Sequence, residues 1–331
     1  MDEYLELVED VLSDGVYKPN RTGVDTIATF SQHYTVDLST EEFPLLTTKS
    51  MDGYRWKSLI HELLWYLSGE EHIKNLREET KIWDAWADED GRLDTAYGRF
   101  WRRYPVPDSG LDGETWPEDD QRWMNEDEQT FDQIQYAIDT LRENPNSRRI
   151  VISAWHPANA AISTLPPCHY TFVLNVQDGK LNLHLTQRSG DTALGIPFNI
   201  AAYSIIGTLI AREAGLELGK FGHTIVDAHV YCGNGERGEW YADNLSTLQK
   251  KLHSATTPED YLEIRDWLEN EAPEQEEPYD HVPGLLEQLS RDPLQPPTLE
   301  ITDKPMSELE FSDFTLKDYE SHPGIRFAVA E

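Results

Sequence analysis

The sequence predicts a single domain that mixes α-helices with β-strands. Residues 57–67 (KSLIHELLWYL) and about 197–214 are apolar along most of their length, as expected of buried helices. Residues 170–177 and 180–188 read as strands and flank Asp178-Gly179, which is a strong hairpin signal. At 331 residues the chain is long enough to bury a large core between such elements.

Two further elements are predicted near the start of the chain. The first fifteen residues place Leu5, Val8 and Leu12 on one stripe of a helix, and Gly15 is a typical stop signal. A strand is expected from Ile27 to Val36, where β-branched and aromatic residues gather.

The two apolar helices each carry one polar residue of interest. Glu62 lies within the apolar run of 57–67, where a carboxyl is unfavourable unless it is paired or protonated. Burial alone favours a structural carboxyl and a proton carrier equally. Pro197 opens the second helix, and Asn199 lies in the same first turn. Its amide could read a carbonyl and a ring N–H together, or it could be a satisfied buried Asn.

The hairpin strand at 180–188 has two distinct faces. Alternation along the strand separates three leucines from a polar row; the leucines are Leu181, Leu183 and Leu185, and the polar row is Asn182, His184, Thr186 and Arg188.

Two stretches are predicted to be acidic insertions. Residues 105–130 and roughly 235–297 are rich in Pro, Asp, Glu and Gln and lack the apolar spacing of a core. The second contains helical patterns at 240–252 and 261–268, which favour an ordered acidic excursion over a linker. One domain, residues 1–331, with insertions is a simpler interpretation than two domains.

The charge is strongly one-sided. The chain has 28 Lys and Arg against 61 Asp and Glu, which gives a formal net charge of −33. Such a surface repels phosphates and anionic membranes, so it argues against a nucleic-acid binder or a membrane-surface protein. The acidic residues are scattered through the whole chain. We therefore favour adaptation to high salt, where screening reduces self-repulsion, over an acidic partner-binding surface.

Several other classes are disfavoured. No apolar run reaches membrane-spanning length, and the first residues do not resemble a signal peptide. The chain contains two cysteines, Cys168 and Cys232, which cannot staple a fold this large, so a reducing cytoplasm is expected. Histidines and cysteines lack metal-ligand spacing, and no metal is expected.

Cys168 is the leading candidate nucleophile. It follows Pro166-Pro167 and precedes the predicted hairpin, so it lies at the mouth of a strand. The adjacent His169 invites a cysteine-hydrolase interpretation. Neighbouring strand residues point to opposite faces, however, so His169 is badly placed to deprotonate Cys168. An arginine is a better candidate to stabilise the thiolate.

Arginines supply the second signal. Arg148 and Arg149 precede an apolar strand, and Arg188 ends the hairpin. They favour phosphate recognition over surface ion pairs, because planar guanidinium groups match phosphate oxygens. His229 and Tyr231 alternate at the end of another predicted strand and would share a face, although either could be an ordinary strand residue.

Together these segments resemble thymidylate synthases over nearly the whole chain apart from the two acidic stretches. The residues that carry the resemblance are Asn20-Arg21-Thr22-Gly23, Phe43 to Lys49, His61 to Trp65, Ile82-Trp83-Asp84, Trp86-Ala87-Asp88, Tyr97-Gly98, Ser147 to Ile150, Pro167-Cys168-His169, Gln187-Arg188-Ser189, Asp191, Leu194 to Ala201, Asp227, His229, Tyr231 and His322-Pro323-Gly324.

The resemblance implies a role for each matching residue. Cys168 would add to carbon 6 of the uracil ring of deoxyuridylate, with Glu62 organising proton transfers and Tyr97 assisting removal of the carbon 5 proton. 5,10-Methylenetetrahydrofolate would be the co-substrate, and thymidylate and dihydrofolate the products. The implied catalytic set is Cys168, Glu62, Tyr97, Asn199 and Asp191. The implied substrate ligands are Arg21, Arg148, Arg149, Arg188, Ser189, Gly190, Asp191, Asn199, His229 and Tyr231. The implied folate contacts are Trp83, Asp191 and Ala330.

The resemblance also implies an architecture and a partner. It predicts an α+β fold with a mixed, bent sheet, helices on one face and dimer packing through the other. Arg148 and Arg149 would reach the phosphate bound by the neighbouring subunit of a homodimer. A strict ladder across the hairpin pairs Arg188 with His169, so a bulge or bend is needed to bring Arg188 beside Cys168.

Two alternatives remain open. A deoxycytidylate hydroxymethylase of the same fold would be expected to carry Asp in place of Asn199, whereas a uracil hydroxymethylase is harder to exclude. A non-catalytic acidic binding protein would need no nucleophile, so Cys168, Glu62 and Arg188 argue against it.

Overall fold

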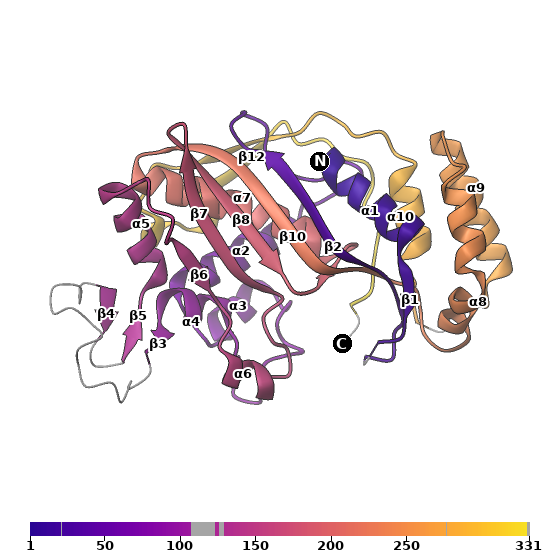
Figure 1. Cartoon of the computed structure of the whole chain (residues 1–331), viewed down its shortest axis with the longest axis horizontal. Helices are drawn as coiled ribbons and strands as arrows, with labels where there is room; N and C mark the ends of the chain where they lie inside the picture. Colours follow the sequence, from indigo (N-terminus) through magenta and orange to yellow (C-terminus); the bar gives the residue numbers. More distant parts are fainter. Residues whose placement is uncertain (21, 107–122, 126–128, 276, 330–331) are drawn as a thin grey trace.

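A mixed sheet forms the centre of the molecule (Figure 1). The computed structural model describes residues 1–331 except 21, 107–122, 126–128, 276 and 330–331. The strand order is β1-β2-β10-β8-β7-β6, and β9 also pairs with β10. The strands are β1 (Val16–Lys18), β2 (Thr26–Asp37), β6 (Val151–Ser153), β7 (His169–Gln177), β8 (Lys180–Gln187), β9 (Gly190–Asp191) and β10 (Glu217–Tyr231).

The long strand β10 ties this sheet together. It pairs antiparallel with β2 along most of its length and parallel with β8 and β9. Its register against β8 shifts between Leu218 and Phe221, which marks an irregularity in a strand that arches across the sheet (Figure 1). The predicted mixed, bent sheet of an α+β fold is therefore confirmed.

Helices pack against one face of this sheet, behind it in Figure 1. The central one is α7 (Gly195–Ala214), whose side chains are buried on nearly all sides, so its sequence is apolar all round rather than amphipathic. The neighbouring helices are α2 (Tyr54–Ser68), α3 (Lys74–Glu79), α4 (Tyr97–Arg102) and α5 (Gln133–Glu143). Both predicted apolar helices are thus confirmed as α2 and α7.

The predicted hairpin is formed by β7 and β8. Asp178 and Gly179 both have positive φ, 50° and 77°, which is the conformation of a tight two-residue hairpin turn. Leu181, Leu183 and Leu185 are buried on the helix side, as the alternation predicted. The opposite face of the sheet has no helix over it in Figure 1, and Val151 is 47% exposed at its edge.

The first helix and the strand after it are also confirmed. Helix α1 (Asp2–Asp14) buries Val8 and Leu12, and β2 covers the predicted strand. Gly15 ends the helix for a steric reason, because a Cβ there would lie 2.3 Å from the Val11 carbonyl oxygen and 2.7 Å from an Ile27 methyl. Its φ of −68° is ordinary, so close packing rather than a left-handed turn requires glycine.

The acidic stretch at 235–297 is largely helical. It forms α8 (Gly235–Leu252), α9 (Pro258–Glu271) and α10 (Val282–Leu289) at one end of the molecule (Figure 1). The chain leaves and returns at one point, because Cys232 forms a bridge with Asp280. Buried side chains from α8, α9 and α10 belong to the same core cluster as those of the sheet, so this stretch has more core-facing residues than its composition indicated. That it is an insertion stays a prediction.

A buried ion pair closes the base of the excursion formed by α8 and α9. The Arg237 Nε donates to Asp280 Oδ2 at 2.7 Å, and the Tyr241 hydroxyl donates to the same oxygen at 2.8 Å. The Arg237 and Asp280 side chains are 2% and 0% exposed. The Asp280 Oδ1 also accepts the Val282 N–H at 3.0 Å, at the first residue of α10.

Smaller elements complete the described chain. Residues 105–130 lie mostly outside the described residues, and the flanking segments form a small sheet. The small sheet is formed by β3 (Tyr104–Pro105), β4 (Met124–Asn125) and β5 (Thr130–Phe131). A separate two-stranded sheet is formed by β11 (Thr298–Ile301) and β12 (Phe314–Lys317). The remaining short elements are α6 (Pro157–Ile162) and the 3-10 turns Met306–Glu308 and Phe311–Asp313.

The buried pair makes a testable contribution to stability. We expect Arg237→Met to lower the free energy of unfolding by about 3–5 kcal/mol, because it leaves the Asp280 carboxylate buried without its partner. Arg265→Met is the matched control, since Arg265 pairs with Asp266 at the surface and should contribute less than about 1 kcal/mol. Urea unfolding at fixed protein concentration measures both. Equal losses for the two variants would contradict the assignment.

Candidate active site

The Cys168 thiol and the Arg188 guanidinium meet at the open end of the hairpin. Cys168 immediately precedes β7 and is half-buried, and Arg188 immediately follows β8. The Arg188 side chain lies 3.5 Å from Cys168 Sγ through one terminal nitrogen. It is fixed there by hydrogen bonds to the carbonyls of Pro166 and Pro167, at 2.6 and 3.1 Å. A guanidinium in this position favours the thiolate over the thiol.

A register shift makes this contact possible. His169 pairs with Gln187, whereas Thr171 pairs with Thr186, so one extra residue lies on β7 between the two pairs. The Arg188 N–H then donates to the Cys168 carbonyl at 2.9 Å. The irregularity that the sequence required is therefore present, and it moves Arg188 from opposite His169 to opposite Cys168.

His169 faces the core and does not act on the thiol. Its ring stacks on Tyr97 with a centroid distance of 3.6 Å, and its Nδ1 is 2.7 Å from the Tyr203 hydroxyl. Burial lowers the pKa of His169 to about 3. A neutral ring held this way cannot serve as the base of a cysteine hydrolase at neutral pH, in agreement with the strand alternation.

Tyr97 connects the thiol to the helix layer. It is the first residue of α4, and its hydroxyl accepts the Cys168 backbone N–H at 2.8 Å. Its buried ring contacts Trp83 edge-on at 6.1 Å between centroids. Burial raises the pKa of Tyr97 well above its ordinary value, so the hydroxyl keeps its proton at neutral pH.

Glu62 lies on the same side of the molecule, on α2. Its Oε1 accepts the Trp83 indole N–H at 2.7 Å, and Trp83 in turn contacts Tyr97. The residue as a whole is half-buried, but burial around the carboxyl raises its pKa to about 7, against the opposing effect of hydrogen bonds from Tyr66 and Trp83. Glu62 can therefore take up or release a proton near neutral pH.

The segment after Arg188 positions a second group of predicted residues. Ser189 leads into β9, whose Gly190 and Asp191 pair with Ala228 and His229 of β10. Gly190 is required by packing, because a Cβ there would lie 2.5 Å from Ile196 Cδ1.

Asp191 folds back over the start of α7. Its Oδ1 accepts the N–H groups of Ala193 and Leu194 at 2.9 and 3.3 Å. Its Oδ2 has no hydrogen bond to a described residue. Asn199 lies one turn into α7, half-buried, and its amide likewise forms no hydrogen bond within the described parts of the chain.

His229 and Tyr231 lie side by side on β10, with their ring centroids 5.2 Å apart. The His229 Nδ1 is 3.2 Å from Asp227 Oδ1, and the other Asp227 oxygen pairs with Lys18. The His229 hydrogen bond lowers the pKa of Asp227 to about 2, with Lys18 adding to the effect. A carboxylate held in this state fixes the orientation of the His229 ring.

Lys49 and the Asp227–Lys18 pair were not singled out as site residues from the sequence. Lys49 is buried, and its Nζ donates to the Ala193 carbonyl at 2.5 Å. Burial lowers the pKa of Lys49 to about 7, against the opposing effect of Asp191. Its only sequence signal was a place in the motif Phe43 to Lys49, which does not indicate burial.

Other predicted residues are placed apart or cannot be placed. Arg148 and Arg149 are exposed just before β6, and neither side chain forms an ion pair or a hydrogen bond with a described residue. The Arg149 backbone N–H donates to Ser147 Oγ at 3.3 Å. Arg21 and Ala330 lie outside the described residues. Among the residues that the structure describes, no group of three or more His, Cys, Asp or Glu could hold a metal ion.

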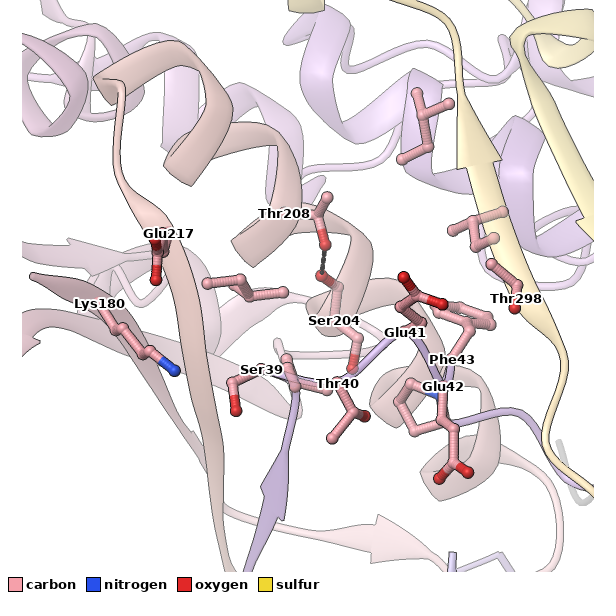
Figure 2. A pocket seen from close by; sticks show the side chains of 15 residues that line it. Ser39, Thr40, Glu41, Glu42, Phe43, Lys180, Ser204, Thr208, Glu217 and Thr298 are labelled. Atoms are coloured by element: carbon pink, nitrogen blue, oxygen red, sulfur yellow. Dashed lines mark hydrogen bonds between the residues drawn. The ribbon is translucent and has the colours of Figure 1, made fainter.

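A separate hollow lies away from these residues (Figure 2). It has a volume of about 590 Å³ and lies between the end of β2, α7 and β11. Three carboxylates and one lysine line it: Glu41, Glu42, Glu217 and Lys180. It contains none of the predicted site residues.

Comparison with known proteins decides the family. The family model described as thymidylate synthase matches residues 2–331. A thymidylate synthase from Haloferax volcanii is 67% identical over 329 residues, which cover 98% of this chain and 96% of that protein. The chain belongs to the thymidylate synthase family. It is therefore a methyltransferase enzyme, and the predicted family and reaction are confirmed. The expected salt adaptation fits the source of this relative. No helix in the described part of the chain is long and apolar enough to cross a membrane.

The neutral state of His169 can be tested directly. We expect its ring protons to show no titration between about pH 4.5 and 8 by NMR, with His169→Phe used to assign the resonance. The unfolded ring has a pKa of about 6.5, so the unfolded state binds protons first as the pH falls. His169 therefore contributes a loss of stability below about pH 6.5. A titration midpoint between pH 6 and 7 in the folded protein would contradict this.

Proposed function

We propose that this chain converts deoxyuridylate to thymidylate through a covalent adduct on Cys168. The observation that carries the proposal is the 3.5 Å contact between Cys168 Sγ and Arg188, in a chain of the thymidylate synthase family. Carbons 5 and 6 of uracil form a conjugated system, and a soft thiolate is suited to conjugate addition at carbon 6. The addition makes carbon 5 nucleophilic, and expulsion of the Cys168 thiolate at the end restores the ring.

The residues on the folate side fit a pterin. The Asp191 Oδ2 is without a hydrogen bond to any described residue, and a pterin ring offers N–H donors to a carboxylate. Trp83 offers an aromatic surface beside Glu62. 5,10-Methylenetetrahydrofolate is a co-substrate that supplies the one-carbon unit and the hydride, and dihydrofolate is the product. In this proposal Asp191, Trp83 and Ala330 hold it, with Asp191 also ordering the start of α7.

Glu62 and Tyr97 move and position protons. Glu62 has a pKa raised to about 7 by burial, so it can exchange a proton with the uracil ring through water. The Tyr97 hydroxyl, fixed by the Cys168 N–H, assists removal of the carbon 5 proton. Asn199 can donate to the uracil carbonyl and accept from the ring N–H, which distinguishes uracil from cytosine.

Cations and hydroxyl ligands hold the rest of the nucleotide. In this proposal, the phosphate ligands next to the thiol are Arg188, Ser189 and Gly190. Arg21 would add a further phosphate ligand. His229 and Tyr231 bind the deoxyribose hydroxyl. The Lys18–Asp227–His229 chain supports this role, because it leaves the opposite ring nitrogen of His229 for the ligand.

A product assay tests the proposal. Purified protein is incubated with deoxyuridylate and methylenetetrahydrofolate at several KCl concentrations, because a net charge of −33 favours folding in salt. We expect thymidylate, and we expect Cys168→Ser to lower kcat by at least about 10³-fold while deoxyuridylate still binds. Hydroxymethylated deoxyuridylate would favour the hydroxymethylase alternative. Absence of turnover at every salt concentration would favour a binding role, and full activity of Cys168→Ser would defeat the covalent mechanism.

We propose that two copies pack through the open face of the sheet. This face is without helices in Figure 1, and Val151 and Val226 are exposed at 47% and 36%. Arg148 and Arg149 are exposed beside it and form no ion pair with a described residue. In a symmetric dimer, Arg148 and Arg149 of each subunit would point toward the nucleotide phosphate bound by the other subunit.

Mixed dimers test the shared site. Cys168→Ser and the double variant Arg148→Ala/Arg149→Ala should each be nearly inactive alone. Co-refolded at equal amounts, they should recover about one quarter of the wild-type rate, because half the dimers are mixed and each has one intact site. No recovery, with dimers present by light scattering, would show that the arginines serve their own subunit.

We also propose a single catalytic domain in the reducing cytoplasm. One continuous core cluster joins the sheet and the helices of 235–297, and Cys168 and Cys232 are not joined by a disulfide. Recovery of the native protein in a secreted or membrane fraction would contradict the location.

A further inference from the structure

His281 lies at the junction of three parts of the proposed site. It directly precedes α10, and its side chain is 1% exposed. Its ring contacts Tyr231 edge-on with a centroid distance of 5.5 Å, and it contacts Phe327 of the C-terminal segment at 5.0 Å. Its Nδ1 is 4.0 Å from Asp191 Oδ1. His281 lies within the acidic stretch at 235–297, where no sequence pattern indicated a site residue.

The two ring nitrogens of His281 have different partners. Nε2 is 2.9 Å from the Ala328 carbonyl oxygen, which can only accept, so Nε2 carries the hydrogen. Burial lowers the pKa of His281, against the opposing effects of Asp191, Ala328 and Asp280, so the ring is neutral and Nδ1 is an acceptor. Nδ1 is buried and has no hydrogen-bond partner among the described residues. A buried acceptor beside a carboxylate oxygen suits one donor shared between them, such as a water or an amino group.

The ring cannot easily turn or retreat. The His281 backbone N–H donates to the Tyr231 carbonyl at 2.9 Å. The preceding residue, Asp280, is held by the buried pair with Arg237 and by Tyr241. The excursion α8–α9 therefore anchors the backbone from which His281 reaches the C-terminal segment.

Other contacts within the described chain hold the same C-terminal segment, residues 322–329. The His322 N–H donates to the Thr47 carbonyl at 2.8 Å, and Arg291 donates to the Pro323 carbonyl at 2.7 Å. Arg55 donates to the Ile325 carbonyl at 3.1 Å, and the Lys49 ammonium lies 4.6 Å from the centroid of the Phe327 ring. Of these contacts, the bond from His281 to Ala328 lies furthest along the chain. It therefore holds the segment close to the last residue that the structure describes.

We propose that His281 is a positioning residue for the folate side of the site. His281 holds the C-terminal segment through the Ala328 carbonyl and shares a hydrogen-bond donor with Asp191. The inference rests on the proposed function, because the folate side is defined by Asp191 and the C-terminal segment. His281 acts through these groups and is not assigned a contact with the reacting atoms.

A pair of amide variants separates the two ring nitrogens. His281→Gln keeps an N–H near the position of Nε2, whereas His281→Asn keeps a polar group near Nδ1 and cannot reach Ala328. We expect His281→Asn to raise KM for methylenetetrahydrofolate by about tenfold, because the Ala328 carbonyl loses its donor. His281→Gln should stay within about threefold of wild type. Both should bind deoxyuridylate within about twofold of wild type.

His223→Gln is the matched control. His223 is also buried, with its ring nitrogens bonded to Gln187 and Tyr34, but it makes no contact with the described residues of the C-terminal segment. It should lower thermal stability without changing the folate KM by more than about twofold. If His281→Asn shifted the folate KM no more than this control, or if His281→Gln and His281→Asn were equally impaired, the proposal would be overturned.

Amide hydrogen exchange keeps the inference independent of catalysis. In the unliganded protein, His281→Asn should accelerate exchange in the peptide covering 322–329, and His281→Gln and His223→Gln should not. This holds even if the wild-type protein makes no thymidylate, in which case the proposed function fails and the anchoring role is still tested. Unchanged exchange in His281→Asn would refute the anchoring role.

Discussion

Arg188 reaches Cys168 because one extra residue lies on β7 between the pairs His169–Gln187 and Thr171–Thr186. Without this bulge, the ladder set by the turn at Asp178-Gly179 would place the guanidinium opposite a buried, neutral histidine. The bulge also lets His169 face the core and Cys168 face away from it. A single register change therefore places the structural histidine and the reactive thiol on different sides of β7. The other site residues lie around the thiol.

The helices next to the Cys168–Arg188 pair add groups that differ in their proton affinity. Tyr97 holds its proton because burial raises its pKa, while Glu62 has a pKa near 7 and can exchange one. Trp83 connects the two, because its indole N–H donates to Glu62 and its ring contacts Tyr97 edge-on. A site with one stabilised thiolate and one neutral-range carboxyl is suited to addition followed by proton transfer, and not to hydrolysis by a Cys–His pair.

The sequence predicted the parts of this structure that depend on local pattern. The hairpin, the faces of β8 and the apolar helices α2 and α7 follow from alternation, turn residues and composition over short windows. Counting residues across the turn paired Arg188 with His169, so a bulge or bend was needed once the resemblance implied that Arg188 lies beside Cys168. Contacts between distant segments did not follow in this way. Lys49 near Asp191 and Lys18 with Asp227 join residues more than 140 positions apart, and no spacing rule links them.

The excursion α8–α9 shows how such long-range contacts can hold an acidic chain together. With 61 acidic residues, each exposed Lys or Arg has several carboxylates with which it could pair, so no single surface pair contributes much to stability. Salt also screens these surface pairs. The Arg237–Asp280 pair is almost fully buried, so screening weakens it much less. Because Asp280 and His281 are consecutive, the contact that fixes the excursion also fixes the ring beside Asp191 and Ala328. The attachment of this acidic excursion and the geometry of the folate side then depend on the same buried charge.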